Sequence, residues 1–244
     1  MRFEVQPNVA VTRRRWPEST PPPTIVRRDL ADVAREVQIK QRPTGSRMVK
    51  RAIDIAGSAV GLVLLFPVFV VVAALVRLTS KGPAFFAQER CGLGGQTFRF
   101  YKFRTMVADA EARKAELEHL NEMRGPVFKI ARDPRITKLG AFLRKSSLDE
   151  LPQLWNVLKG DMSLVGPRPP LPDEVQQYNA YQAQRLSVIP GITGLWQVSG
   201  RSSLPDFDNW LALDLEYAQR QSLGLDLRIL VKTVAVVVTA KGAS

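Results

Sequence analysis

The chain has 244 residues, with 35 lysines and arginines against 23 aspartates and glutamates, so its formal net charge is +12 at pH 7. One cysteine and one histidine exclude an internal disulfide framework and a zinc site built from thiolate or imidazole groups. The length allows one modest globular domain, and the positive charge favours an anionic partner, either a membrane surface or a nucleic acid.

The first part of the chain predicts no packed core. Residues 1–46 contain scattered arginines, the proline run Pro21, Pro22 and Pro23, and few large apolar side chains. A segment of this composition buries too little apolar surface to offset the entropy lost on folding. We therefore expect a disordered basic tail over residues 1–46.

Residues 47–81 carry the strongest hydrophobic signal. No residue from Ile55 to Val76 is charged, and at ~1.5 Å per residue a helix of this length matches the hydrocarbon core of a bilayer. Pro67, which follows Phe66, lacks a backbone donor and predicts a membrane break at this pair. Basic residues, which favour the cytoplasmic side, flank both ends. The pattern favours a re-entrant helix–break–helix over a simple span.

Residues 82–205 predict a folded domain of mixed type. Thr97–Phe103 alternates in polarity and predicts a strand, which follows a glycine-rich turn at residues 92–95. Three helices are expected, and the last has a proline in its first turn and Gly160 just beyond its end. Their ranges are Val107–Glu122, which we expect to be exposed, Thr137–Lys145 and Pro152–Lys159.

Residues 206–244 predict amphipathic helices at a membrane interface. Asp206–Arg220 carries Trp210 and Tyr217, which are residue types that favour the interface. Leu225–Lys241 is mostly aliphatic but interrupted by Arg228 and Lys232, so it is expected to lie on the membrane rather than cross it. The predicted fold class is α+β, mostly helical, with a re-entrant membrane helix, a small domain at residues 82–205 and these interface helices.

Two adjacent carboxylates, Asp149 and Glu150, precede the helix that begins near Pro152. The start of a helix offers free amide donors and a positive dipole, which suit phosphate groups. A purely structural interpretation is also open, because Ser147 and Glu150 have the spacing of a capping box. Pro152 argues against it, since the proline would stand where such a helix needs a backbone donor.

Basic residues surround this pair in the sequence and could hold a diphosphate with charge-assisted hydrogen bonds. Arg168 is favoured because Pro167 and Pro169 stiffen the backbone around it. Carboxylates beside a diphosphate also suggest Mg²⁺, with Asp149, Glu150 and Asp161 as candidate ligands, although Asp161 equally suits a helix exit. The candidate substrate-binding residues are Lys102, Arg104, Arg144, Lys145, Arg168 and Arg201.

Four segments resemble the bacterial sugar transferases, which are monotopic phosphoglycosyl transferases that initiate polysaccharide synthesis. The resemblance extends from about residue 50 to residue 239. The segments begin at Lys102 (Lys-Phe-Arg-Thr-Met), Asp133 (Asp-Pro-Arg-Ile-Thr-Lys-Leu-Gly), Ser147 (Ser-Leu-Asp-Glu-Leu-Pro, continuing to Gly-Pro-Arg-Pro) and Pro190 (Pro-Gly-Ile-Thr-Gly-Leu-Trp-Gln-Val-Ser-Gly-Arg). Many relatives have Ser-Pro at the membrane break where this chain has Phe66 and Pro67.

The resemblance implies an enzyme that transfers a hexose 1-phosphate from a UDP-sugar to undecaprenyl phosphate with Mg²⁺. It implies a site at the inner leaflet of the cytoplasmic membrane, with the domain at residues 82–205 catalytic and on the cytoplasmic side. Asp149 would be the nucleophile and form a covalent aspartyl phosphosugar, Glu150 would be its magnesium ligand or electrostatic partner, and UMP would leave. UDP-glucose or UDP-galactose is favoured as the donor for exopolysaccharide or capsule synthesis.

Other interpretations rank lower. A membrane-anchored basic scaffold without catalytic activity would explain the charge and the apolar segment. A nucleic-acid-binding protein would explain the charge alone, so no nucleic-acid partner is expected. Inner-leaflet lipids are expected partners, and a homodimer stays open because the chain has amphipathic surfaces.

Overall fold

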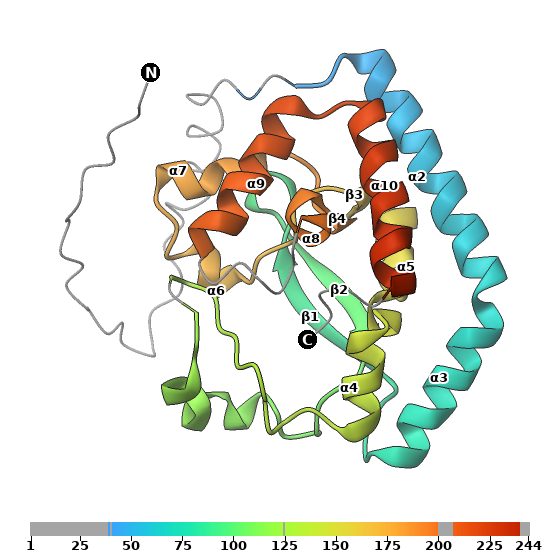
Figure 1. The fold of residues 1–244 in the computed structure, drawn as a ribbon, viewed down its shortest axis with the longest axis vertical. Helices are drawn as coiled ribbons and strands as arrows, with labels where there is room; N and C mark the ends of the chain where they lie inside the picture. Colours follow the sequence, from blue (N-terminus) through green and yellow to red (C-terminus); the bar gives the residue numbers. More distant parts are fainter. Residues whose placement is uncertain (1–38, 40, 124, 200–206, 240–244) are drawn as a thin grey trace.

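The computed structural model describes residue 39 and residues 41–123, 125–199 and 207–239. These residues form the mixed α/β, mostly helical structure that the sequence predicts. Two small sheets of two strands each lie near the centre, and helices surround them (Figure 1). Most of the predicted tail, together with Arg201, lies outside the described residues.

Helices α2 (Thr44–Leu64) and α3 (Phe66–Thr79) form a bent arm along one side of the molecule (Figure 1). The two axes differ by 61° at Leu65, and Pro67 lies in the first turn of α3, so the break is where the proline predicts it. Among the described residues, no single helix is long and apolar enough to span a membrane, whereas this bent pair together meets the same criteria of length and composition.

The two sides of this arm differ in polarity. Asp54 and Ser58 of α2 are buried against the domain, and Val72 and Val76 of α3 pack on the core. The outward side is apolar yet exposed, which on a protein surface marks contact with another apolar phase. Its large residues include Val60, Val63, Leu64, Phe66, Val70, Val71, Leu75 and Leu78.

Strands β1 (Phe85–Cys91) and β2 (Thr97–Phe103) form an antiparallel hairpin, and η1 (Leu93–Gly95) is the turn between them. The strand and turn predictions are confirmed. The side chain of Asn156 fixes α5 (Gln153–Lys159) to β2. Its Nδ2 donates to the carbonyl of Arg99 at 2.6 Å, and its Oδ1 accepts from the amide of Tyr101 at 3.2 Å.

Helix α4 (Lys138–Lys145), the short η3 (Leu148–Glu150) and α5 follow one another closely. Thr137 caps α4, because its Oγ1 accepts from the amide of Gly140 at 2.9 Å. Gly160 ends α5 with φ of 97°, a conformation that glycine adopts without strain. Both helices confirm the sequence prediction within one residue.

The remaining elements surround a parallel pair, β3 (Ser163–Val165) with β4 (Gly191–Thr193). Helix α10 (Leu223–Thr239) packs on α8 (Leu195–Val198) and on this pair, and α2 packs on α5 and β3. Between the strands lie α6 (Pro172–Val175), α7 (Ala180–Ala183) and η4 (Gln184–Ser187). After them come α8 (Leu195–Val198), α9 (Phe207–Arg220) and α10 (Leu223–Thr239).

Three features differ from the sequence predictions. Val107–Glu122 does not form a regular α-helix; it contains turns and the 3₁₀ segment η2 (Ala112–Leu120), none of whose residues is buried. Charged residues on every side leave it no apolar face to stabilise a longer helix. Tyr217 is not an interface anchor, since it is buried and its hydroxyl hydrogen-bonds Asp226 at 2.8 Å. The end of the predicted tail is ordered, because α2 begins at Thr44 and Arg42 is buried.

Candidate functional site

The two carboxylates lie on a sharp turn between α4 and α5. Ser147 has φ of 58°, the only positive φ among the described residues other than glycine, and this reverses the chain into η3. The Ser147 side chain forms no capping hydrogen bond, so the structural interpretation of the pair as a capping box fails. Asp149 is buried and Glu150 half-buried, and η3 contacts both β2 and α4.

Burial and like charge act together on Asp149. Burial and then the negative charge of Glu150 raise the pKa of its carboxyl, which lies at about 6. The positive charges of Lys102, Arg144 and Arg168 act in the opposite direction and lower this pKa. The structure therefore brings four of the predicted site residues around Asp149. No hydrogen bond to the Asp149 carboxylate forms among the residues that the structure describes.

Arg168 is tied to Glu150. Its Nη1 donates to Glu150 Oε1 at 3.0 Å, and its backbone carbonyl accepts from Nη2 of Arg185 at 3.1 Å. Arg185 is itself buried, where it pairs with Asp214 and donates to the hydroxyl of Tyr178 at 2.9 Å. The loop that carries Arg168 is thus held from inside the domain, so the guanidinium is positioned before any substrate arrives.

Lys102 and Arg144 approach from β2 and α4. Arg144 Nε donates to Thr105 Oγ1 at 2.9 Å, which fixes the side chain but leaves its other donors for a ligand. The Lys102 ammonium lies 4.9 Å from the ring centre of Phe86, within cation–π range. Burial, and then the charge of Arg144, lowers the Lys102 pKa to about 8.

Arg90 is a site residue that the sequence reasoning missed. Burial and the charge of Arg168 lower its pKa to about 10, which shows that the two guanidinium groups lie close enough to interact. Its Nη1 donates to the carbonyl of Pro169 at 3.1 Å, and its guanidinium lies 5.4 Å from the ring centre of Phe100. The alternating pattern of β1 places Arg90 on the same strand face as Phe86, a signal that could have revealed it.

Three predicted residues lie elsewhere. Arg104 follows the end of β2 and donates to both oxygens of Ser80 at 2.9 Å, so it links β2 to the end of α3. Lys145 is exposed in the last turn of α4. Asp161 lies beyond the opposite end of α5 from Asp149, where it accepts from Lys159 at 2.9 Å.

The donor set for a divalent cation is therefore smaller than predicted. Within the described residues, no cluster of three or more acidic, histidine or cysteine side chains could hold a metal ion. The three-carboxylate set fails because Asp161 is at the far end of α5. Asp149 and Glu150 alone fit Mg²⁺, which binds through one or two carboxylates and takes its other ligands from phosphates and water.

An apolar pocket of about 230 Å³ opens beside these carboxylates. Glu150 and Ser147 lie at its polar side, while Leu151 and Leu154 form part of its apolar wall. Helix α10 contributes Thr233, Val236 and Val237. We call it the α10 pocket. The outward face of α10 beyond it is also apolar and exposed, at Leu227, Val231 and Val234.

Comparisons with known proteins show which family the chain resembles. The model of the bacterial sugar transferase family matches residues 45–240. The galactosyl transferase CpsE of Streptococcus agalactiae is 50% identical over 196 residues, which are 80% of this chain and 43% of that protein. The exopolysaccharide production protein ExoY of Rhizobium meliloti is 41% identical over 83% of this chain and 90% of its own length. The undecaprenyl-phosphate galactose phosphotransferase of Salmonella typhimurium is 43% identical, but this chain spans only 42% of it.

Proposed function

Because this chain belongs to the bacterial sugar transferase family, we propose that it transfers a hexose 1-phosphate from a UDP-sugar to undecaprenyl phosphate. The observation that carries the proposal is the buried Asp149 surrounded by Lys102, Arg144 and Arg168. A carboxylate that accepts no hydrogen bond from any described residue and lies inside a cationic cluster suits attack on an anionic diphosphate. The family match confirms the expected class of enzyme, and the reaction below is our proposal for this chain.

In the first step, an Asp149 oxygen attacks the phosphorus that carries the sugar. The bond from this phosphorus to the bridging oxygen breaks, UMP leaves with that oxygen, and an aspartyl phosphosugar remains. In the second step, a phosphate oxygen of the lipid attacks the same phosphorus and the Asp149 carboxylate leaves. Each step is one displacement, so the enzyme would show ping-pong kinetics.

The cations have separate roles in this scheme. Lys102 and Arg144 face the nucleophile and would hold the diphosphate, and Arg90 adds a third positive charge beside them. Arg168, positioned by Glu150, would neutralise charge that develops during the transfer. Mg²⁺, held by Asp149 and Glu150 together with the donor phosphates, would supply further positive charge.

The acceptor is expected to approach from the α10 pocket. This pocket is apolar along α10 and reaches Glu150, so a polyprenyl chain inside it would bring its phosphate beside the carboxylates. The bent arm and the exposed face of α10 supply apolar surface for the bilayer. We propose that the arm re-enters the inner leaflet of the cytoplasmic membrane and that the domain stays on the cytoplasmic side. The product would begin exopolysaccharide or capsule assembly.

The test is a UMP-release assay with the full chain, Mg²⁺, undecaprenyl phosphate and a panel of UDP-sugars. UDP-galactose and UDP-glucose are expected to give the highest rates, since relatives are named for galactose and for glucose. Asp149→Asn should lose activity by at least a thousandfold, because an amide is a poor nucleophile. Asp208→Asn, which changes an exposed carboxylate on α9, is the matched control and should keep it.

A second assay addresses the covalent step. Wild-type protein given donor without acceptor should release about one UMP per active site and gain the mass of a hexose phosphate at Asp149. Inactivity with every UDP-sugar, or normal turnover by Asp149→Asn, would refute the proposal. A scaffold without catalytic activity would release no UMP, either as the wild type or as the Asp149→Asn and Asp208→Asn variants.

A further inference from the structure

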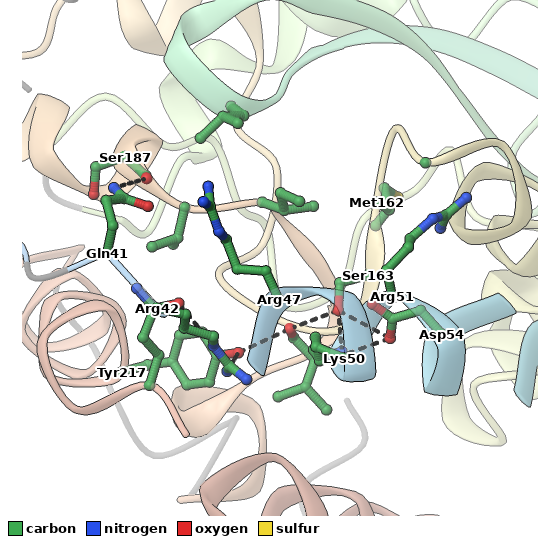
Figure 2. Close-up of a pocket in the computed structure, with 16 residues that line it drawn as sticks. Gln41, Arg42, Arg47, Lys50, Arg51, Asp54, Met162, Ser163, Ser187 and Tyr217 are labelled. Atoms are coloured by element: carbon green, nitrogen blue, oxygen red, sulfur yellow. Dashed lines mark hydrogen bonds and ion pairs between the residues drawn. The ribbon is translucent and has the colours of Figure 1, made fainter. Parts of the chain in front are cut away.

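A second cavity, distinct from the candidate active site, lies where α2 begins. It has a volume of about 170 Å³, and we call it the entry pocket. Its walls come from the start of α2, the segment from Gly160 to β3, and residues 187–189 (Figure 2). The length of α5 separates this pocket from Asp149 and Glu150. Arg51, which lines the pocket, donates to the carbonyls of Val157 and Leu158 at the far end of α5. The seven residues of α5 extend about 10 Å.

Four cations line the entry pocket: Arg42, Arg47, Lys50 and Arg51. Arg42 and Lys50 are balanced by two carboxylates, since Arg42 pairs with Asp226 at 2.8 Å and Lys50 with Asp54 at 2.9 Å. The first pair and a longer contact of Lys50 with Asp226, at 3.7 Å, fasten the start of α2 to α10, while the amide of Leu164 in β3 donates to Asp54 at 3.0 Å. These cations therefore need no ligand.

Arg47 and Arg51 provide the surplus charge. Among the described residues, Arg51 donates only to neutral carbonyls, and the one hydrogen bond of Arg47 is a donation to Thr44 Oγ1 at 3.2 Å. Figure 2 shows the Arg47 side chain extending between the Gln41–Ser187 wall and the Met162–Arg51 wall. Ser187 adds a buried hydroxyl that has no hydrogen-bond partner among the described residues. The pocket thus presents two guanidinium groups and a hydroxyl, a donor set that suits a phosphate group.

The surroundings distinguish a lipid phosphate from a free one. On α2 the exposed apolar side begins at Met48 and Val49, directly beside Arg47, so the pocket lies where the helix starts to present apolar surface. Leu93 and Ile189 line the pocket and are themselves exposed, at 48% and 43%. A soluble anion would bury none of the apolar surface at the rim, whereas the glycerol and acyl groups of a phospholipid would cover it.

We propose that the entry pocket binds the phosphate of an anionic phospholipid, with Arg47 as its main contact. The bound lipid would fix the depth of α2 at the headgroup level, next to the basic residues that favour the anionic leaflet. This inference rests on the proposed placement of the arm in the membrane, and it concerns a site that takes no part in the transfer reaction.

The test uses the purified full chain in a neutral detergent and three probes: dihexanoyl phosphatidylglycerol, dihexanoyl phosphatidylcholine and inorganic phosphate. Apparent affinities come from the rise in the thermal unfolding midpoint with probe concentration. Phosphatidylglycerol should stabilise the wild type, while phosphatidylcholine and inorganic phosphate should bind at least tenfold more weakly. Arg47→Ala should weaken phosphatidylglycerol about tenfold, as expected when a hydrogen bond to a charged group is lost.

Two variants control the result. Arg47→Lys keeps the charge and should restore part of the affinity, whereas Arg132→Ala removes an exposed guanidinium from a loop and should change nothing. Equal binding by phosphatidylcholine, or unchanged affinity in Arg47→Ala, would overturn the proposal. Inorganic phosphate that binds as tightly as phosphatidylglycerol would assign the pocket to a free anion and overturn the lipid assignment. Membrane fractionation of the wild type tests the placement of the arm separately.

Discussion

Asp149 is subject to opposing electrostatic effects. Its burial and the adjacent Glu150 favour the protonated form, while Lys102, Arg144 and Arg168 favour the ionised form that a nucleophile needs. Groups with such perturbed pKa values concentrate at functional sites. Two predictions follow from the balance, one for activity and one for stability.

The pH dependence of kcat/KM for the UDP-sugar should report the ionisation of this carboxyl. Activity should fall as the pH drops through about 6, because protonated Asp149 cannot attack. Glu150→Gln should move this acid limb to lower pH, since it removes a negative charge that raises the Asp149 pKa, even though its rate is lower. Glu116→Gln, at an exposed position of η2, should leave the limb in place. An unmoved limb in Glu150→Gln would contradict the assignment.

Asp149→Asn should be inactive and yet more stable. A carboxyl whose folded pKa is raised contributes stability below its unfolded pKa of 3.8, and this contribution is lost as the pH rises through about 6. The amide does not ionise, so at pH 7.5 the variant should gain roughly 2–3 kcal/mol in its free energy of unfolding. Thermal unfolding in detergent at pH 7.5 and pH 4 would measure it. The gain should vanish at pH 4, and a less stable variant at pH 7.5 would refute the argument.

The sequence predicts the carboxylate pair and three of the cations that lie near it, but it misses a fourth. Asp149, Glu150 and Arg168 lie in contiguous segments with local signals: adjacent carboxylates before a helix and an arginine between prolines. Arg104 lies away from Asp149 because the strand ends at Phe103 and the next side chain turns toward Ser80, so its role in substrate binding stays a prediction. The alternation of β1 places Arg90 on the strand face of Phe86, but its approach to Arg168 depends on how the hairpin packs, and this is why it was missed.

At the scale of elements, α10 contributes both to the core and to a pocket. It packs on α8 and the parallel strand pair, and it also forms one wall of the α10 pocket. Its sequence shows an apolar helix with two cations, but not which of its valines face Glu150. Helices with local caps, such as Thr137 for α4 and Gly160 for α5, were predictable, whereas the pocket between α10 and η3 results from contacts between distant segments.

The valines of α10 allow a matched test of the acceptor route. Val236→Trp should fill the α10 pocket and raise the KM for undecaprenyl phosphate about tenfold or more, because the larger ring excludes the polyprenyl chain. Val234→Trp places the same ring on the exposed face and should leave this KM within about twofold. Steady-state kinetics with varied acceptor provides the measurement.

The donor half-reaction separates this prediction from the proposed function. Both tryptophan variants should release UMP and form the aspartyl adduct at the wild-type rate when no acceptor is present. Loss of adduct formation in Val236→Trp would mean that the ring disturbs η3 itself. An unchanged acceptor KM would place the lipid elsewhere.

At the scale of the whole molecule, the proposed placement of the bent arm predicts on which side of the membrane the start of α2 and the end of α3 lie. A re-entrant arm keeps Gly45 and Thr79, which lie near its two ends, on the cytoplasmic side. Single cysteines introduced at these exposed positions should resist a membrane-impermeant maleimide in intact spheroplasts and react after lysis. Labelling of one of the two from outside would show a span instead.

The natural Cys91 provides a low background for this experiment. It is buried in an apolar cluster with Val175 and Leu186, and burial raises the pKa of its thiol to about 11. The chain without introduced cysteines should therefore remain unlabelled even after lysis, which is the control. The apolar segment and its proline were readable from the sequence. The ion pair that joins α2 to α10, and the hydrogen bond that joins α2 to β3, required the folded structure.

Arg51 fixes the position of α2 relative to the end of α5, because it donates to the carbonyls of Val157 and Leu158. Arg51 of α2 thus holds one end of α5, and the other end of α5 follows Asp149 and Glu150 in the chain. With the arm in the bilayer as proposed, the height of Asp149 above the lipid surface would be fixed by the fold rather than by a flexible linker. A rigid spacer of this kind would let the enzyme meet a phosphate that never leaves the plane of its neighbours.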